Sequence, residues 1–293
     1  MAQTQMALDS LDFDGTVALA TKVAPHVDIL EIGTPCIKHN GIKLLETLRA
    51  KFPNNKILVD LKTMDAGYYE AEPFYKAGAD ICTVLGTADI GTIKGVIDVA
   101  NKYGKQAQID LINVTDKKAR TLEVTKLGAH IIGVHTGLDQ QAAGQTPFGD
   151  LALVTSLNTG AKVSVAGGIK AATVRQVVDA GADIVVAGAA IYGAADPAAA
   201  AKEITSLSHA APAAAGGNKW LPWVLAIIAA VIVISLFNGK KAEEPATEAA
   251  PAAEVAPEAA AAEAAPVEAA APAEAAATDL VEAAKEAAPT PAQ

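Results

Sequence analysis

Residues 59–65, VDLKTMD, place two carboxylates and an amine in a segment that is otherwise apolar. Asp60 and Lys62 end the run 56–62, KILVDLK, which has the composition of a buried strand, and Asp65 follows it. Side chains alternate along a strand, so Asp60 and Lys62 point to the same face. Because an unpaired buried charge is costly, we expect the Lys62 ammonium to lie between the carboxylates of Asp60 and Asp65 and to stay protonated there.

Other apolar runs also end in single polar residues that could do chemistry. Glu31 and Asp60, from neighbouring runs, can supply two oxygen ligands to a hard divalent ion such as Mg²⁺. His135, in the stretch GVHTG, is a candidate for moving a proton, and Asp9 and Asp110 end two further runs. Each residue alone fits a structural ion pair or a core histidine equally well. Their shared position at the ends of the runs favours an active site.

Glycines follow the last two apolar runs, Gly168 in VAGG and Gly188 in VAGAAI. Glycine lets the backbone approach an anion closely, and N–H groups at the start of a helix bind phosphate. The same glycines would also suit tight turns between a strand and a helix. We therefore expect a phosphate site here.

Short β-branched runs alternate with amphipathic segments as far as residue 206, and this alternation predicts the elements that position these residues. Eight such units in about 200 residues predict an α/β chain folded as a (β/α)8 TIM barrel, whose chemistry lies at the carboxyl ends of the strands. The expected strands are 5–9, 28–34, 56–62, 80–86, 106–113, 130–137, 162–168 and 183–191.

A doubly wound open sheet is the competing fold. It is disfavoured because no G-x-G-x-x-G follows the first expected strand. The barrel is further supported by the recurrence of Gly-Ala-x-Ile at 78–81, 128–131 and 181–184, each at an expected helix-to-strand junction and about two strand–helix units apart. Such spacing is typical of a quasi-symmetric barrel.

Beyond the barrel domain, 1–206, the composition changes twice. Residues 207–218 are rich in Ala and Gly and predict a linker. Residues 219–239 contain an uncharged apolar stretch, 220–237, bounded by lysines and long enough for a transmembrane helix. A buried core or oligomerisation helix is the alternative. We expect the span to hold the catalytic domain at the membrane on its cytoplasmic side, and the lysines do not decide which side the tail occupies.

The remaining segment, 240–293, is a tail rich in Ala, Pro and Glu. Residues 242–293 hold eleven acidic residues and one lysine, which accounts for the chain's net charge of −10. This composition predicts disorder, with 278–287 as a possible short amphipathic helix that docks on a partner. Acidic and basic residues balance in the rest of the chain, so no basic surface indicates nucleic-acid binding. Two cysteines are too few for a disulfide framework.

Six motifs together resemble the orotidine-monophosphate-decarboxylase superfamily and, within it, the family of 3-hexulose-6-phosphate synthases. The resemblance covers about residues 1–206 and not the tail. The motifs are MALD (6–9), LEIGTP (30–35), VDLKTMD (59–65), GVHTG (133–137), VAGG (165–168) and VAGAAI (186–191).

The resemblance implies a Mg²⁺-dependent aldol condensation, with Mn²⁺ as a possible substitute, between D-ribulose 5-phosphate and formaldehyde. Glu31 and Asp60 would hold the metal, and Lys62 would stabilise the enediolate. His135 would move the proton, with Lys62 as the alternative. Substrate hydroxyls would bind Asp9 and Asp110, and the phosphate would bind Gly168, Gly188 and Ala189. Related enzymes share sites across a homodimer, so Asp65 would serve the neighbouring subunit.

Two departures separate this chain from the related 3-keto-L-gulonate-6-phosphate decarboxylases, which are the alternative function within the resemblance. Those enzymes carry an arginine shortly after the histidine of the sixth strand and another after the glycine of the eighth. Here the two stretches are HTGLD (135–139) and GAA (188–190). Decarboxylation requires a site that handles a carboxylate, so the absence of both arginines argues against it. It favours a neutral one-carbon substrate instead. A second alternative is a membrane-anchored scaffold whose tail is the interaction segment.

Overall fold

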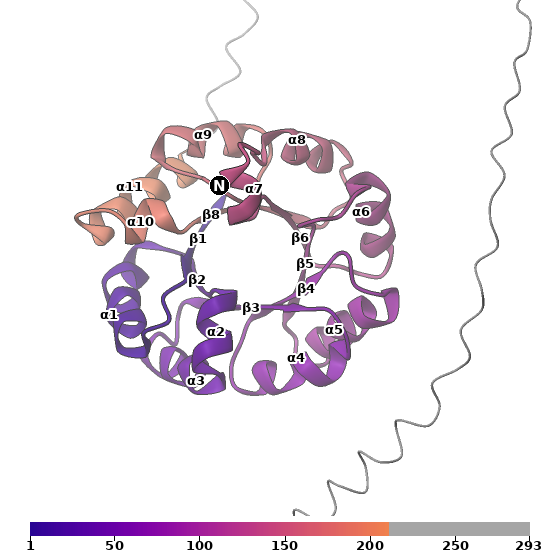
Figure 1. Ribbon diagram of the computed structural model, residues 1–293, viewed down its shortest axis with the longest axis horizontal. Coiled ribbons are helices and arrows are strands. Elements are labelled where there is room, and N and C mark those ends of the chain that lie inside the picture. Colours follow the sequence, from indigo (N-terminus) through magenta and orange to yellow (C-terminus); the bar gives the residue numbers. More distant parts are fainter. Residues whose placement is uncertain (211–293) are drawn as a thin grey trace, which may run out of the picture. The chain divides into compact units, whose positions relative to one another are not determined.

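The computed structural model describes residues 1–210, and these form a closed barrel of eight parallel strands (Figure 1). Each strand pairs with its sequence neighbours, and β8 closes the ring on β1. The α/β class and the (β/α)8 barrel are thereby confirmed. The strands are β1 (Gln3–Leu8), β2 (Ile29–Ile32), β3 (Lys56–Thr63), β4 (Ile81–Leu85), β5 (Gln106–Asp110), β6 (Ile131–His135), β7 (Lys162–Ala166) and β8 (Ile184–Ala187).

Helices surround the barrel, as Figure 1 shows. Several begin at an aspartate whose side chain accepts a backbone hydrogen bond, for example Asp12 before α1 and Asp196 before α11. The helices are α1 (Phe13–Val23), the 3-10 turn η1 (Ala24–His26), α2 (Thr34–Asn40), α3 (Ile42–Lys51), α4 (Gly67–Lys76), α5 (Ile90–Lys102), α6 (Lys117–Lys126), α7 (Leu138–Ala142), α8 (Phe148–Ser156), α9 (Ala171–Asp179), α10 (Ala189–Tyr192) and α11 (Pro197–His209).

The apolar residues form two clusters that belong to different parts of the barrel. The larger one packs the outer faces of the strands against the helices and includes Leu44, Leu48 and Val96. The smaller one lies inside the barrel. Its members are Ala7, Ile29, Leu58, Ile81, Ile131, Ile184 and Val186. Because side chains alternate along each strand, the residues that follow these on the same face point into the barrel mouth.

Several expected strands end earlier in the structure, and the last helix extends past residue 206. The last expected strand, 183–191, ends at Ala187, and α10 begins directly after Gly188. The barrel domain does not end at 206, because α11 continues to His209 and buries Ala201, Ile204 and Ser208.

The later part of the chain lies outside the described residues. This holds for most of the predicted linker (207–218), for the predicted membrane helix (219–239) and for the predicted disordered tail (240–293). Within residues 1–210, no helix is long and apolar enough to cross a bilayer. The membrane span and the tail therefore stay predictions.

Candidate active site

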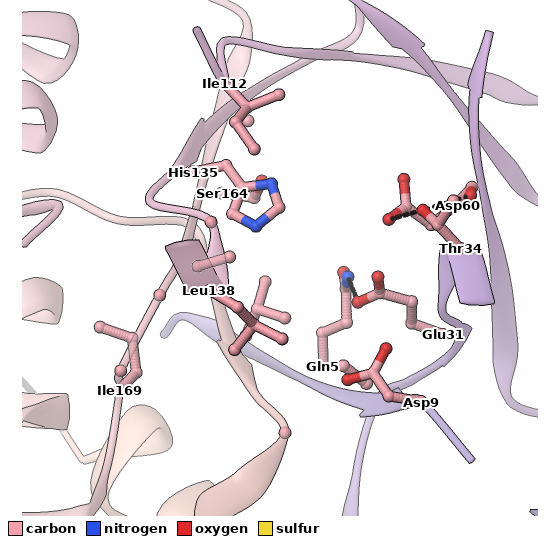
Figure 2. A pocket seen from close by; sticks show the side chains of 18 of the residues that line it. Gln5, Asp9, Glu31, Thr34, Asp60, Ile112, His135, Leu138, Ser164 and Ile169 are labelled. Carbon is pink, nitrogen blue, oxygen red and sulfur yellow. Dashed lines mark hydrogen bonds between the residues drawn. The ribbon is translucent and has the colours of Figure 1, made fainter. Parts of the chain in front are cut away.

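A cavity of about 880 Å³ opens at the carboxyl ends of the strands. It brings together nearly every residue that the sequence singled out, from all parts of the ring, and Figure 2 shows several of their side chains pointing into it. The predicted residues that line it are Asp9, Glu31, Asp60, Lys62, Asp110, His135, Gly168, Gly188 and Ala189. Asp65 is the exception and is exposed outside the cavity.

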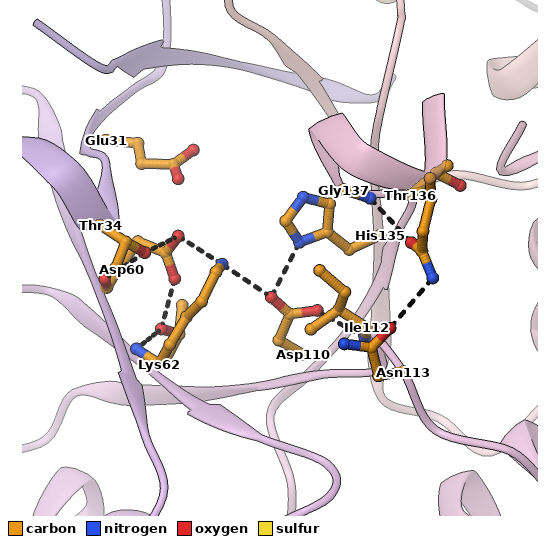
Figure 3. A network of polar contacts seen from close by, with 12 residues as sticks. Glu31, Thr34, Asp60, Lys62, Asp110, Ile112, Asn113, His135, Thr136 and Gly137 are labelled. Atoms are coloured by element: carbon orange, nitrogen blue, oxygen red, sulfur yellow. Dashed lines mark hydrogen bonds and ion pairs between the residues drawn. The ribbon is translucent and has the colours of Figure 1, made fainter. Parts of the chain in front are cut away.

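Lys62 lies between two carboxylates, but only one of them is a predicted partner. Its Nζ donates to Asp60 Oδ2 at 2.7 Å and to Asp110 Oδ2 at 3.0 Å (Figure 3). The expectation that Asp65 would be the second partner is wrong, because the chain turns away after β3 and Asp65 accepts a hydrogen bond from the N–H of Ala66 instead. The two anions raise the pKa of Lys62, although burial by itself would lower it.

An irregularity in β3 sets the direction of the Lys62 side chain. The register between β3 and β4 shifts between Val59 and Thr63, and Lys62 has a φ of +46°, in the left-handed region. The backbone N–H of Lys62 donates to Thr83 Oγ1 at 2.9 Å, and this hydroxyl donates to Asp60 Oδ1 at 2.6 Å. Thr83 therefore joins the irregular backbone to the carboxylate beside it.

Asp60 is held by two threonines that sequence reasoning missed. Besides Thr83, Thr34 places its hydroxyl 2.7 Å from Asp60 Oδ2. Thr34 lies in the motif LEIGTP, just after β2. Its position beyond the end of a strand could have indicated that it belongs to the site. With Lys62 included, Asp60 is only 7% exposed and has three polar side-chain partners.

Asp110 joins Lys62 to His135. Its Oδ2 lies 2.9 Å from His135 Nδ1, and its Oδ1 accepts the N–H of Ile112 at 2.9 Å (Figure 3). Burial opposes ionisation of Asp110, but the hydrogen bond and charge of His135, with the charge of Lys62, lower its pKa to about 2. Burial likewise opposes protonation of His135, yet Asp110 keeps the pKa of His135 above its ordinary value.

Glu31 is a buried carboxylate that lies near the negative charge of Asp60. Gln5 donates its Nε2 to Glu31 Oε2 at 2.7 Å. Burial and the negative charge of Asp60 raise the pKa of Glu31 to about 8. Burial, together with Asp60, also raises the pKa of Asp9, which lines the same cavity. This corner of the cavity therefore has an excess of carboxylates that a cation would relieve.

A divalent ion of the Mg²⁺ type fits this donor set. Glu31 and Asp60 both line the cavity, and Mg²⁺ commonly uses one or two carboxylates while water and substrate fill its other positions. Residues 1–210 contain no group of three or more His, Cys, Asp or Glu side chains arranged around one point, as an all-protein metal cage would need. The two carboxylates match an ion that shares its ligands with a substrate.

The opposite side of the cavity, after β7 and β8, has the features of an anion site. Gly167 and Gly168 have positive φ values of 117° and 67°, and a Cβ on Gly167 would come within 2.5 Å of the Thr136 carbonyl oxygen. Lys170 lines the cavity here and is exposed. Sequence reasoning missed this lysine, which supplies a cation to a site expected to rely mainly on backbone donors.

Comparison with known proteins agrees with this geometry. The family described as orotidine 5'-phosphate decarboxylase / HUMPS matches residues 2–204. The chain belongs to this family. Among its curated members, a 3-hexulose-6-phosphate synthase of Methylomonas aminofaciens is 86% identical over 208 residues, which are 71% of this chain and 100% of that protein.

Solved structures of family members have the same barrel. The 3-hexulose-6-phosphate synthase of Salmonella typhimurium is 40% identical with a TM-score of 0.69, over 70% of this chain and 98% of that one. A 3-keto-L-gulonate-6-phosphate decarboxylase of Vibrio cholerae is 28% identical with a TM-score of 0.64, over 71% of this chain and 97% of that one. Both kinds of enzyme have this barrel, so the fold alone does not decide the reaction.

Proposed function

We propose that this chain is a 3-hexulose-6-phosphate synthase, which condenses D-ribulose 5-phosphate with formaldehyde to give a hexulose 6-phosphate. The observation that supports this most is its 86% identity to a curated synthase along the whole of that protein. The site agrees with it, because one cavity contains an ammonium, a histidine held by a carboxylate, and glycines suited to a phosphate.

The cavity residues fit the proposed steps. Loss of a C1 proton from the sugar converts its C1–C2 unit into an enediolate, C1 then bonds to the formaldehyde carbon, and the formaldehyde oxygen takes up a proton. Asp110 occupies Nδ1 of His135, so Nε2 is the nitrogen left to accept the C1 proton. Lys62, kept protonated by Asp60 and Asp110, stabilises the negative charge that develops on the sugar oxygens.

Mg²⁺ belongs to the same proposal, with Mn²⁺ as a substitute. Glu31 and Asp60 would hold the ion, which would supply Lewis-acid stabilisation to the sugar oxygens. Asp9 lies at the rim beside them and would bind a substrate hydroxyl. Gly168, Gly188, Ala189 and Lys170 would bind the phosphate at the other side of the cavity.

We also propose a homodimer with shared sites, in which Asp65 acts in the neighbouring subunit. Its carboxylate is exposed and lies outside its own subunit's cavity, which this arrangement requires. Mixing Lys62→Ala subunits with Asp65→Ala subunits tests the proposal. Activity recovered in the mixture would support shared sites, whereas two inactive variants that stay inactive together would contradict them.

The alternative is the sister reaction, decarboxylation of a keto-acid sugar phosphate. Both stretches where those enzymes carry arginines, 135–139 and 188–190, contain no arginine or lysine here. The deciding experiment supplies the protein with ribulose 5-phosphate, formaldehyde and Mg²⁺, and separately with 3-keto-L-gulonate 6-phosphate. We expect formaldehyde consumption that EDTA stops and Mg²⁺ restores. CO₂ release without formaldehyde consumption would overturn the proposal.

A further inference from the structure

The cavity extends deeper into the barrel than Lys62 and His135. Three polar residues line this deeper part, each two positions before a cavity residue on its strand and therefore on the same face. They are Gln5 on β1, Gln108 on β5 and Ser164 on β7, and we call them the inner shelf. Figure 2 shows Gln5 and Ser164 within the view of the cavity.

The inner shelf is set among apolar side chains. In the strand register, Gln5 pairs with Ile29, Gln108 with Ile131 and Ser164 with Ile184, and all three isoleucines belong to the apolar cluster inside the barrel. Barrel interiors are usually filled by bulky branched residues. Two amides and a hydroxyl at these positions therefore need a reason beyond packing.

Two acceptors of the inner shelf have no partner among the described residues. They are Oε1 of Gln5 and Oε1 of Gln108, on side chains that belong to residues 1% and 8% exposed. A buried acceptor without a donor is unfavourable, so native proteins rarely keep one unless a water or ligand supplies the donor. Both residues line the cavity, so a small molecule there can reach them.

Space for such a molecule is kept open by small residues. Gly133, on β6 beside Gln108, also lines the cavity, and a Cβ added there would lie 3.1 Å from Gln108 Nε2. Ala7 and Ala166 line it as well. None of the three residues of the inner shelf is charged, although Gln5 donates to Glu31. A small neutral molecule that donates hydrogen bonds would suit them.

We propose that the inner shelf binds the one-carbon substrate in its hydrated form, methanediol. This inference rests on the proposed synthase function. Formaldehyde in water is mainly this neutral diol, whose two O–H groups match the two unpaired acceptors, whereas free formaldehyde has no donor. Loss of water then leaves formaldehyde beneath the sugar carbon that attacks it, while the phosphate stays at the outer side of the cavity.

Steady-state kinetics on Gln108→Leu and Ser164→Ala test the proposal, with formaldehyde and ribulose 5-phosphate varied separately. We expect the KM for formaldehyde to rise at least about tenfold in Gln108→Leu, and less in Ser164→Ala, because hydrogen bonds to that substrate are lost. The KM for ribulose 5-phosphate should stay within about twofold. Gln176→Leu, the same change on an exposed residue of α9, is the matched control.

The outcomes distinguish the inner-shelf proposal from the synthase function on which it rests. Parallel changes in both KM values, or no change in the KM for formaldehyde, would overturn the inner-shelf proposal while leaving the synthase function in place, and would indicate that the shelf holds water only. A wild-type protein without formaldehyde turnover would overturn both. Thermal unfolding of each variant checks the fold, and Ser164→Ala, which removes a single oxygen, keeps the test valid if Gln108→Leu does not fold.

Discussion

Asp110 is the residue on which the other two candidate catalytic groups depend. It contacts both Lys62 Nζ and His135 Nδ1 through one carboxylate oxygen, Oδ2. This sharing places the ammonium and the imidazole on either side of a single anion. Changes at Asp110 should therefore alter the charge of His135 and the position of Lys62 together.

The pH profile of Asp110→Asn follows from this arrangement. His135 must be neutral to accept a proton, so kcat/KM of the wild type should fall as the pH drops below the raised pKa of His135. Removing the anion lowers that pKa, so we expect the acid limb of the profile to move to lower pH. Turnover itself should fall about 100-fold. An acid limb that stays in place would show that His135 is not the group that titrates.

The same pair makes the stability of the fold depend on pH. His135 has a raised pKa, so its contribution is fully present below its ordinary pKa and is lost as the pH rises through the raised value. Asp110 has a pKa of about 2 in the fold, so its contribution is present above its ordinary pKa and is lost as the pH falls through about 2. Urea unfolding should find Asp110→Asn most destabilised between these limits, at roughly pH 4 to 6.5. An equal loss at pH 9 would contradict this.

At the scale of elements, the irregular end of β3 and its link to β4 decide where Lys62 points. Thr83 on β4 accepts the backbone N–H of Lys62 and donates to Asp60. A threonine at this place therefore stabilises both the unusual backbone and the charged pair. The isosteric change Thr83→Val separates this role from simple packing.

We expect Thr83→Val to lower the free energy of unfolding by about 1–3 kcal/mol, because it leaves a backbone donor and a carboxylate oxygen without a partner. Turnover should fall as well, since Lys62 loses its fixed direction. Thr121→Val is the matched control, because the Thr121 hydroxyl in α6 is buried without a partner among residues 1–210. Urea unfolding of the two variants should show a loss for Thr83→Val alone. Equal losses would mean that Thr83 acts only through packing.

The elements also show what the sequence could and could not predict. All eight strands were predicted, because buried parallel strands are nearly continuous apolar runs and Gly-Ala-x-Ile marks several junctions. The cavity residues were predicted because polar side chains at strand ends converge in a barrel. Asp110 was missed as the partner of Lys62 because the two lie on strands that are not neighbours, and a simple alternation does not anticipate the irregular β3. Lys170 was missed because it follows its strand in a loop.

At the scale of the molecule, the described chain ends on the side of the barrel away from the cavity. His209 lies 3.0 Å from Asp28, which precedes β2 at the amino ends of the strands, and Arg175 donates to the carbonyl of Ala210 at 2.8 Å. The cavity lies at the carboxyl ends. Ala210, the last described residue, therefore lies at the end of the barrel opposite the cavity.

A fragment of residues 1–210 should keep the kcat and both KM values of the full chain. Fractionation of cells that express the two forms tests the predicted membrane helix, with the full chain expected in membranes and the fragment outside them. A fragment of residues 1–196 should not fold, because it lacks α11, which packs against α1, α9 and β1. If the 1–210 fragment folds but loses turnover, the later residues contribute to the site.

Formaldehyde consumption by Lys62→Ala and Asp60→Ala tests the central claim most directly. In the presence of ribulose 5-phosphate and Mg²⁺, we expect each variant to lose at least about 100-fold in kcat/KM while its thermal unfolding shows a folded barrel. Asp98→Asn, an exposed change on α5, should match the wild type. If both variants folded and kept wild-type turnover, the charged cluster in the barrel mouth would not be the catalytic site.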